Sequence, residues 1–288
     1  MIFIKKNVIL FFCFFFVSAV IGYDSLNRFD YDKLLSKNGN LSDISSYKIV
    51  IEEGLRGYET EDRIAPRIIT PVLSHYVYKI FKGKVRSWNE IFFSILVVNS
   101  FFMSCICILM MSYLKFLNIT PTLSPQLMFF GSFGVTAFYL SGLIDSSICF
   151  FIFLYIFNFI KKNYFIAWVA SILICLSKET SFIYITIFHI AFLLNNYFFE
   201  RKIKLEHVLF PILNFLTNIM IINFYISNYL GINIYEYIFV FQSEGGAANY
   251  QKSLIDIPKF FIFFTPIVLF LYQGFKSVDK KFASLVII

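Results

Sequence analysis

The chain has 288 residues, of which 58% are hydrophobic and only 15% are charged, and phenylalanine alone contributes 40. Soluble domains carry charge on roughly a quarter of their residues, so this composition excludes a soluble globular protein. The net charge of +7 does not indicate nucleic-acid binding, because the lysines and arginines lie in short clusters between apolar runs and form no continuous basic face.

The first apolar run covers residues 8–23 and follows Lys5 and Lys6. A basic start before an apolar run is shared by signal peptides and first transmembrane helices. The end of the run, Val20-Ile21-Gly22, is a poor cleavage site, and the rest of the chain is itself apolar enough to lie in a membrane. We therefore expect residues 8–23 to be a retained first transmembrane helix.

Residues 24–67 form a long polar stretch with nine acidic and seven basic residues. In the following segment, 68–81, apolar residues fall in adjacent pairs four residues apart, which predicts an amphipathic helix. Fourteen residues are short for a crossing, which takes about 20, so an interfacial position is expected. Residues 24–88 are thus interpreted as one long loop that carries interfacial helices.

The rest of the chain, 89–288, consists of apolar runs separated by single charges or small polar clusters. These runs cover approximately 89–113, 126–144, 146–160, 164–177, 180–199, 206–228 and 258–273, and a last one starts at Phe282. Several are short for a full span. With the first helix they predict an all-α, polytopic transmembrane bundle of about eight or nine crossings, in a single membrane domain over residues 1–288.

The distribution of lysine and arginine predicts the orientation in the membrane. If the amino terminus is cytoplasmic and segment 68–81 does not cross, cytoplasmic connections hold eleven of these residues and the short external ones hold three. Cytoplasmic loops of membrane proteins carry this excess, whereas long loops cross with little regard to charge. We expect a multi-pass protein of the plasma (cytoplasmic) membrane, with the amino terminus in the cytoplasm and the 24–88 loop outside.

This topology places the sparse charges between later apolar runs on the extracytoplasmic side. Asp145 is the sole charge between two apolar runs, and Lys178-Glu179 interrupts a long, nearly uncharged stretch. Ionisable groups at a membrane boundary are costly, which indicates a functional site. The structural alternatives are that Asp145 caps the next helix, and that Lys178 and Glu179 form a turn whose charges reach the interface.

The first loop holds further candidates. Asp43 precedes a short helical pattern at 48–55, so capping and catalysis are both open for its carboxylate. Arg63 and Arg67 come just before the amphipathic segment, where guanidinium groups could bind a phosphate in a bidentate manner. Contact with lipid headgroups is an equal alternative for these two arginines.

Signals for metals, cofactors and known catalytic motifs are weak. Asp30-Tyr31-Asp32 has the spacing of a DxD metal motif, but three residues in an acidic loop carry little information. The five cysteines lie inside apolar runs without zinc-site spacing, and we interpret them as packing residues. No Ser-His-Asp order, phosphate-binding loop or dinucleotide fingerprint is present, and the sequence leaves open whether a divalent metal takes part.

In its arrangement the chain resembles the GT-C superfamily of integral membrane glycosyltransferases. The shared features are a cytoplasmic amino terminus, one helix, a long acidic external loop with membrane-lying helices, and further acids in later external loops. The matching pieces are residues 43–57 and 63–71, Asp145, and Lys178-Glu179, within roughly residues 1–200. The resemblance implies transfer of a sugar from a polyprenyl-phosphate donor to a glycan, lipid or protein acceptor at the extracytoplasmic face.

The resemblance also implies roles for single residues. Asp43 would be the catalytic base, or Asp24 in its place, since family members usually carry their first acid close after the first helix. Asp145 would be a second acid at a metal or donor-phosphate site, and Glu179 a third. Arg63, Arg67 and Lys178 would then face the donor phosphate. The implied partners are membrane lipids and the polyprenyl-phosphate-linked sugar.

Three other functions are compatible with a polytopic chain. A polysaccharide polymerase of the O-antigen type usually has its large loop late in the chain, whereas the long loop here is early. A transporter or lipid flippase would be expected to show inverted repeats and charges near the midplane, whereas the charges here fall at helix ends. A non-enzymatic assembly partner is not excluded by any feature of the sequence.

Overall fold

The computed structural model describes residues 2–27, 42–59, 67–85, 88–116, 118, 144–178, 181–195, 197 and 204–231. The chain divides into two compact units, Met1–Phe182 and Ile183–Ile288, which are described separately here. The described residues are predominantly helical and contain no strand, which confirms the predicted all-α class.

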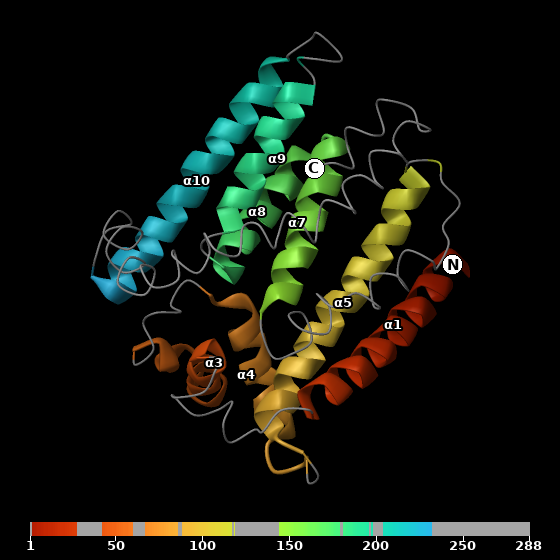
Figure 1. The fold of residues 1–288 in the computed structure, drawn as a ribbon, viewed down its shortest axis with the longest axis vertical. Coiled ribbons are helices and arrows are strands. Elements are labelled where there is room, and N and C mark those ends of the chain that lie inside the picture. Colours follow the sequence, from red (N-terminus) through yellow and green to blue (C-terminus); the bar gives the residue numbers. More distant parts are fainter. Residues whose placement is uncertain are drawn as a thin grey trace, which may run out of the picture. The chain divides into compact units, whose positions relative to one another are not determined.

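The first unit contains six α-helices and a 3-10 helix among its described residues (Figure 1). They are α1 (Ile2–Asn27), α3 (Ser42–Glu53), η1 (Gly54–Glu59), α4 (Ile69–Phe81), α5 (Glu90–Phe116), α7 (Asp145–Ile160) and α8 (Tyr164–Ser177). The second unit contains α9 (Phe182–Asn195), whose first residue belongs to the first unit, and α10 (Leu205–Leu230).

Three of these helices are long and apolar enough to cross a membrane: Asn7–Asn27 of α1, Glu90–Phe116 of α5 and Leu205–Asn228 of α10. They support the interpretation of the chain as a membrane protein. Helices α7 and α8 are apolar but shorter, with 16 and 14 residues. The predicted runs 258–273 and from Phe282 onward lie outside the described residues, as does 126–144 except for Ile144, so the total of eight or nine crossings remains a prediction.

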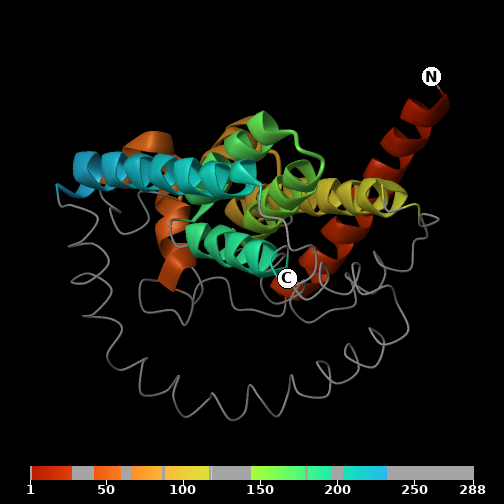
Figure 2. The same cartoon turned by 90° about the horizontal axis from the view of Figure 1, so that it is seen from above.

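Helices α1 and α5 pack side by side in antiparallel directions (Figures 1 and 2). The rings of Phe11 and Phe101 lie 5.7 Å apart, and those of Tyr23 and Trp88 lie 4.9 Å apart. Tyr23 near the carboxyl end of α1 thus meets Trp88, two residues before α5. The end of α1 and the start of α5 therefore lie at the same end of this helix pair. A loop that does not cross the membrane requires this arrangement.

Helices α5 and α7 run parallel. Ring contacts join Phe102 to Phe150 at 5.8 Å and Phe116 to Phe157 at 5.9 Å, so residue numbers rise together along both helices. The crossing predicted at 126–144 is compatible with this parallel arrangement, and all of it except Ile144 lies outside the described residues.

A tight turn joins α7 to α8 in a helical hairpin. Lys162 takes a left-handed conformation with φ of 61°, and the Asn163 N–H donates to the Asn158 carbonyl at 2.8 Å. The two helices pack along their length, with Ala167 and Ala170 buried at 0% and 1% exposure. Small side chains permit the close approach of two helices in a membrane protein. The hairpin therefore brings the first residue of α7 close to the end of α8.

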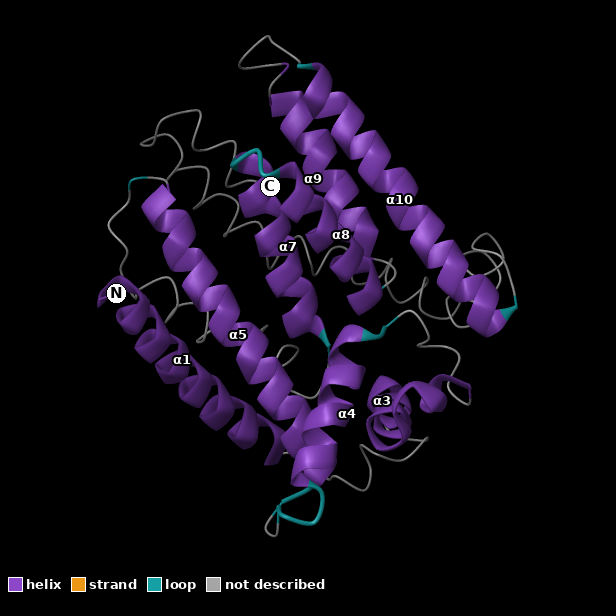
Figure 3. Ribbon diagram, turned by 180° about the vertical axis from the view of Figure 1, so that it is seen from behind, coloured by secondary structure: helices purple, strands orange, loops and turns teal. Residues whose placement is uncertain are grey.

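Helix α4 packs along the first turns of α5, with the rings of Phe81 and Phe93 5.1 Å apart (Figure 3). Gly83, at φ of 74°, allows the chain to turn after α4. Asn89 caps α5, since its Oδ1 accepts hydrogen bonds from the backbone N–H groups of Ile91 and Phe92 at 3.0 and 3.2 Å. The predicted helix at 68–81 is confirmed within one residue.

The buried face of α4 is the one that the sequence pattern would assign to solvent. It consists of Thr70, Pro71, Ser74, His75 and Tyr78. The predicted apolar stripe splits, because Ile68 and Val72 at one edge pack against the core, whereas residues at the other edge are exposed. An apolar face need not point inward when apolar surroundings are available outside the protein.

Helix α3 and η1 pack against α4 around one apolar core. This core joins Tyr47, Val50, Ile51 and Tyr58 of the first loop to Tyr78 of α4, Ile91 and Ile95 of α5, and Ile144 and Ile148 around the start of α7. His75 fixes the contact, since its Nδ1 donates to the Ile51 carbonyl at 2.8 Å. The short helix predicted at 48–55 begins earlier in the structure, at Ser42.

In the second unit, α9 and α10 contact each other through aromatic and histidine rings. The rings of Phe192 and His207 lie 5.2 Å apart, and those of His189 and Phe210 lie 6.4 Å apart. His189 is buried in this unit, at 5% exposure.

Candidate functional site

An ion pair lies at the open end of the α7–α8 hairpin. The Nζ atom of Lys178 is 3.6 Å from Oδ1 of Asp145, and the two side chains are 34% and 26% exposed. Asp145 is the first residue of α7, and Lys178 directly follows α8. The structure thus brings together two residues that the sequence nominated independently, at positions 33 apart in the chain.

The geometry of this pair leaves both groups able to bind a ligand. Charged hydrogen bonds of the N⁺–H···O⁻ type are usually 2.7–2.9 Å long, so a separation of 3.6 Å is a loose contact. A partly exposed ion pair of this kind contributes only about 0–1 kcal/mol to stability. A phosphate or hydroxyl can therefore replace either partner at little cost.

Buried hydrogen bonds hold the first turn of α7 in place. Ser146 Oγ donates to Asn99 Oδ1 at 2.6 Å, which ties α7 to the third turn of α5. Thr70 Oγ1 donates to Ser147 Oγ at 2.8 Å, which ties α7 to α4. All four side chains are buried, at 0–2% exposure. Because Asp145 directly precedes these two serines, its backbone is fixed from two sides.

The structural alternative, in which Asp145 caps α7, is wrong. The N-cap position belongs to Ile144, and no side chain makes a capping hydrogen bond there. Instead, Ser147 Oγ in the first turn donates to the Ile144 carbonyl at 2.8 Å. The carboxylate of Asp145 lies in the first turn of α7 and is directed toward Lys178.

Arg67 is held beside the end of α8. The Ile68 N–H donates to the Leu176 carbonyl at 2.7 Å, which places the backbone of Arg67 next to the turn that precedes Lys178. Two tyrosines of the first loop fix this arginine: the Tyr58 hydroxyl donates to the Arg67 carbonyl at 2.8 Å, and Arg67 Nη1 donates to the Tyr47 hydroxyl at 3.2 Å. The backbone of a second cationic residue thus lies at the same end of the hairpin, and its guanidinium group contacts α3.

The remaining predicted residues are only partly placed. Arg63 and Glu179 lie outside the described residues, as do Asp30 and Asp32. Asp43 lies within the first turn of α3, so it does not precede this helix as the capping expectation required; its side chain is not among those described.

The alternative base, Asp24, is exposed near the end of α1. The neighbouring Leu26 packs with Ile44 and Phe92, so the end of α1 and the starts of α3 and α5 meet. Asp24 and the backbone of Asp43 therefore belong to the same end of the unit as the ion pair.

A small void lies near the start of α7. It is lined by side chains of α3, α4, α5 and Ile144, and it is too tight for a water molecule. Ser74 Oγ lies at this void, is fully buried and has no hydrogen-bond partner in the described part of the chain.

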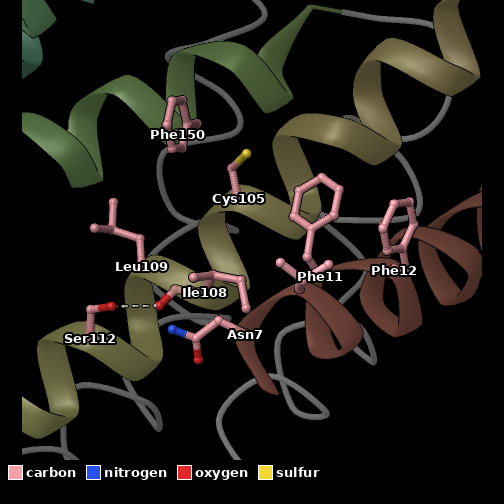
Figure 4. A pocket seen from close by; sticks show the side chains of 9 residues that line it. Asn7, Phe11, Phe12, Cys105, Ile108, Leu109, Ser112 and Phe150 are labelled. Atoms are coloured by element: carbon pink, nitrogen blue, oxygen red, sulfur yellow. Dashed lines mark hydrogen bonds between the residues drawn. The ribbon is translucent and has the colours of Figure 1, made fainter. Parts of the chain in front are cut away.

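A larger hollow in this unit lies toward the other end of α5 (Figure 4). It is an open groove of about 690 Å³ between α1, α5 and α7. Its walls are mainly apolar, with Phe11, Phe12, Leu109 and Phe150 among them, and no ionisable acid or base lines it except the thiol of Cys105. The groove suits hydrocarbon and offers no groups for acid–base chemistry.

Several residues of the site were missed by the sequence analysis. Asn99, Thr70, Ser146 and Ser147 position Asp145, and Tyr47 holds Arg67. One signal was present for Asn99, since an amide inside an apolar helix is costly to bury without a partner. Among the described residues, no group of three or more His, Cys, Asp or Glu side chains could hold a metal ion.

Comparison with protein-family models, with curated proteins and with solved structures finds no match to this chain. Its function is therefore argued from the residues and their arrangement.

Proposed function

We propose that the chain is a membrane glycosyltransferase that transfers a sugar from a polyprenyl-phosphate donor to a glycan, lipid or protein acceptor at the extracytoplasmic face. The observation that carries this proposal is the loose ion pair of Asp145 and Lys178, with Arg67 anchored beside the same helix end. It combines a carboxylate that can accept a proton with cations that can bind a phosphate.

The depth of the pair suits a lipid phosphate. Helix α7 has 16 residues and is thus about 24 Å long, less than the roughly 30 Å of the hydrocarbon core. Lys161 and Lys162, at the closed end of the hairpin, would lie at the cytoplasmic boundary under the predicted orientation. The ion pair at the open end would then lie close to the outer boundary, where the phosphate of a membrane-bound donor is found.

The proposed reaction exchanges one bond at the anomeric carbon of the sugar. The acceptor oxygen forms a bond to this carbon, the bond to the phosphate oxygen breaks, and the acceptor proton passes to a carboxylate. The leaving polyprenyl phosphate gains one negative charge, which Lys178 and Arg67 would stabilise. When the donor phosphate draws Lys178 away, Asp145 loses its partner and becomes available as an acid or base.

The identity of the base is part of the proposal. Asp43, or Asp24 in its place, is proposed as the base for the acceptor, with Asp145 and Glu179 as further acids of the site. Arg63 is proposed to join Arg67 and Lys178 in binding the phosphate. A transporter is less well supported, because the described ion pair lies at helix ends.

The test is a transfer assay with the purified full chain in lipid nanodiscs, labelled polyprenyl-phosphate sugars and a panel of acceptors. Lys178→Gln and Asp145→Asn should each lower transfer by about 100-fold or more. Asp43→Asn and Asp24→Asn are compared to identify the base, since only the variant that removes the base should abolish transfer. Lys162→Gln, at the opposite end of the hairpin, is the matched control and should retain activity.

Wild-type transfer by the Asp145→Asn, Asp43→Asn and Glu179→Gln variants would overturn the assignment. The assignment would also be overturned if the wild-type chain neither transferred sugar from any donor of the panel nor bound any of these donors.

A further inference from the structure

Helix α4 presents an apolar stripe away from the protein. Leu73, Tyr76 and Ile80 follow one another along this helix and are 41%, 58% and 59% exposed. The opposite face is buried against the rest of the first unit. Exposed apolar side chains in a row are favourable only in contact with other apolar groups.

The carboxyl end of the same helix is basic. Lys79, Lys82 and Lys84 lie in its last turn and in the following turn, and all three are exposed. The backbone supports this cluster, since Lys84 Nζ donates to the Ile80 carbonyl at 2.8 Å. Glu90 is an acid at this turn, and its carboxylate accepts a hydrogen bond from the Gly83 N–H at 2.6 Å. The cluster therefore has a net positive charge.

The neighbouring helix places this surface near lipid headgroups. Helix α5 has 27 residues and a length of about 40 Å, which covers the hydrocarbon core and both headgroup layers. Helix α4 packs against the first turns of α5, next to the end that leaves the hydrocarbon. An apolar stripe with lysines at one end is the pattern of a helix that contacts acyl chains and lipid phosphates together.

We propose that the exposed face of α4 with Lys79, Lys82 and Lys84 is a docking surface for anionic phospholipids, in the leaflet on the side of Asp145 and Lys178. The positive charge of the cluster complements the lipid phosphates, and the stripe complements their acyl chains. This proposal does not depend on the proposed sugar transfer.

Fluorescence quenching by brominated lipids tests the surface. A Tyr76→Trp reporter is placed in the full chain, with Trp88→Phe and Trp168→Phe to remove the native signals, and the protein is reconstituted into nanodiscs. Brominated phosphatidylglycerol should quench the reporter more strongly than brominated phosphatidylcholine at the same mole fraction. Each lysine near the membrane surface raises the local enrichment of an anionic lipid by about fivefold. Replacing all three lysines with glutamine should therefore lower the preference for phosphatidylglycerol over phosphatidylcholine by about tenfold or more.

The matched control replaces Lys115, Lys161 and Lys162 with glutamine, which removes the same charge from the other ends of α5 and α7. This control should leave the preference unchanged. Equal quenching by the two lipids with all lysines present would overturn the proposal, as would an equal loss of preference in the control. Absence of quenching by either lipid would show that protein covers the face, and would also overturn it.

Discussion

Lys178 and Asp145 face each other across the open end of the α7–α8 hairpin, with 3.6 Å between the nitrogen and the nearer carboxylate oxygen. Neither helix needs this contact to form, since both are apolar helices joined by a tight turn at their other end. The pair contributes little to stability, and two charges at a membrane boundary are costly. We infer that they are retained for binding or chemistry.

The hydrogen bond between Ser146 and Asn99 should be important for the position of Asp145. Ser146→Ala leaves the buried Asn99 oxygen without this donor and should lower the free energy of unfolding by about 1–3 kcal/mol. Sugar transfer should fall through a lower kcat, because the carboxylate is less well oriented. Thermal unfolding in detergent and steady-state kinetics measure the two effects.

Ser112→Ala is the matched control, since this serine is exposed and donates only to the Ile108 carbonyl of its own helix. It should change neither stability nor transfer. If Ser146→Ala and Ser112→Ala were equally harmless, Asn99 would have no positioning role.

Gly54 and Gly83 should respond differently to alanine. Both have positive φ, 73° and 74°, so alanine is strained at each position. A Cβ at Gly54 would also lie 2.9 Å from Nε2 of His75, whereas nothing lies within 4 Å at Gly83. Gly54→Ala should therefore lower the melting temperature further than Gly83→Ala.

Measuring both glycine variants in a His75→Ala background separates the backbone strain from the steric contact with His75. This background removes the ring that the new methyl group would meet, so the difference between Gly54→Ala and Gly83→Ala should shrink. A difference of the same size in this background would show that the contact with His75 is not its cause.

The predicted orientation can be tested by labelling of single cysteines. In a chain whose five native cysteines are replaced by serine or alanine, Lys84→Cys should react with an impermeant maleimide from outside the cell. Lys162→Cys, at the closed end of the hairpin, should react only after the membrane is opened. Reaction of both positions from the same side would contradict the proposed topology.

Helix boundaries could be predicted from the sequence because charges interrupt the apolar runs. The runs 146–160 and 164–177 agree with α7 and α8 to within one residue, since Lys161, Lys162 and Asn163 separate them. The first helix extends beyond 8–23 at both ends, because polar residues there continue the helix. Composition identifies which residues are helical, but it does not identify which faces meet.

The partners of the two serines that follow Asp145 could not be predicted for this reason. Asn99 lies 47 positions from Ser146, and Thr70 lies 77 positions from Ser147. In a membrane helix nearly every position is apolar, so periodicity does not indicate the rotation of the helix toward its neighbours. The outward apolar stripe of α4 shows the same effect, because apolar side chains there do not mark the core.

A charge swap tests the central claim most directly. Asp145→Lys combined with Lys178→Asp keeps an ion pair at the same place but reverses its ends. We expect each single variant and the swap to lose transfer by about 100-fold or more, while the swap retains the unfolding temperature of the wild type. Recovery of transfer by the swap, together with stability, would show that the pair is only structural and would contradict the account.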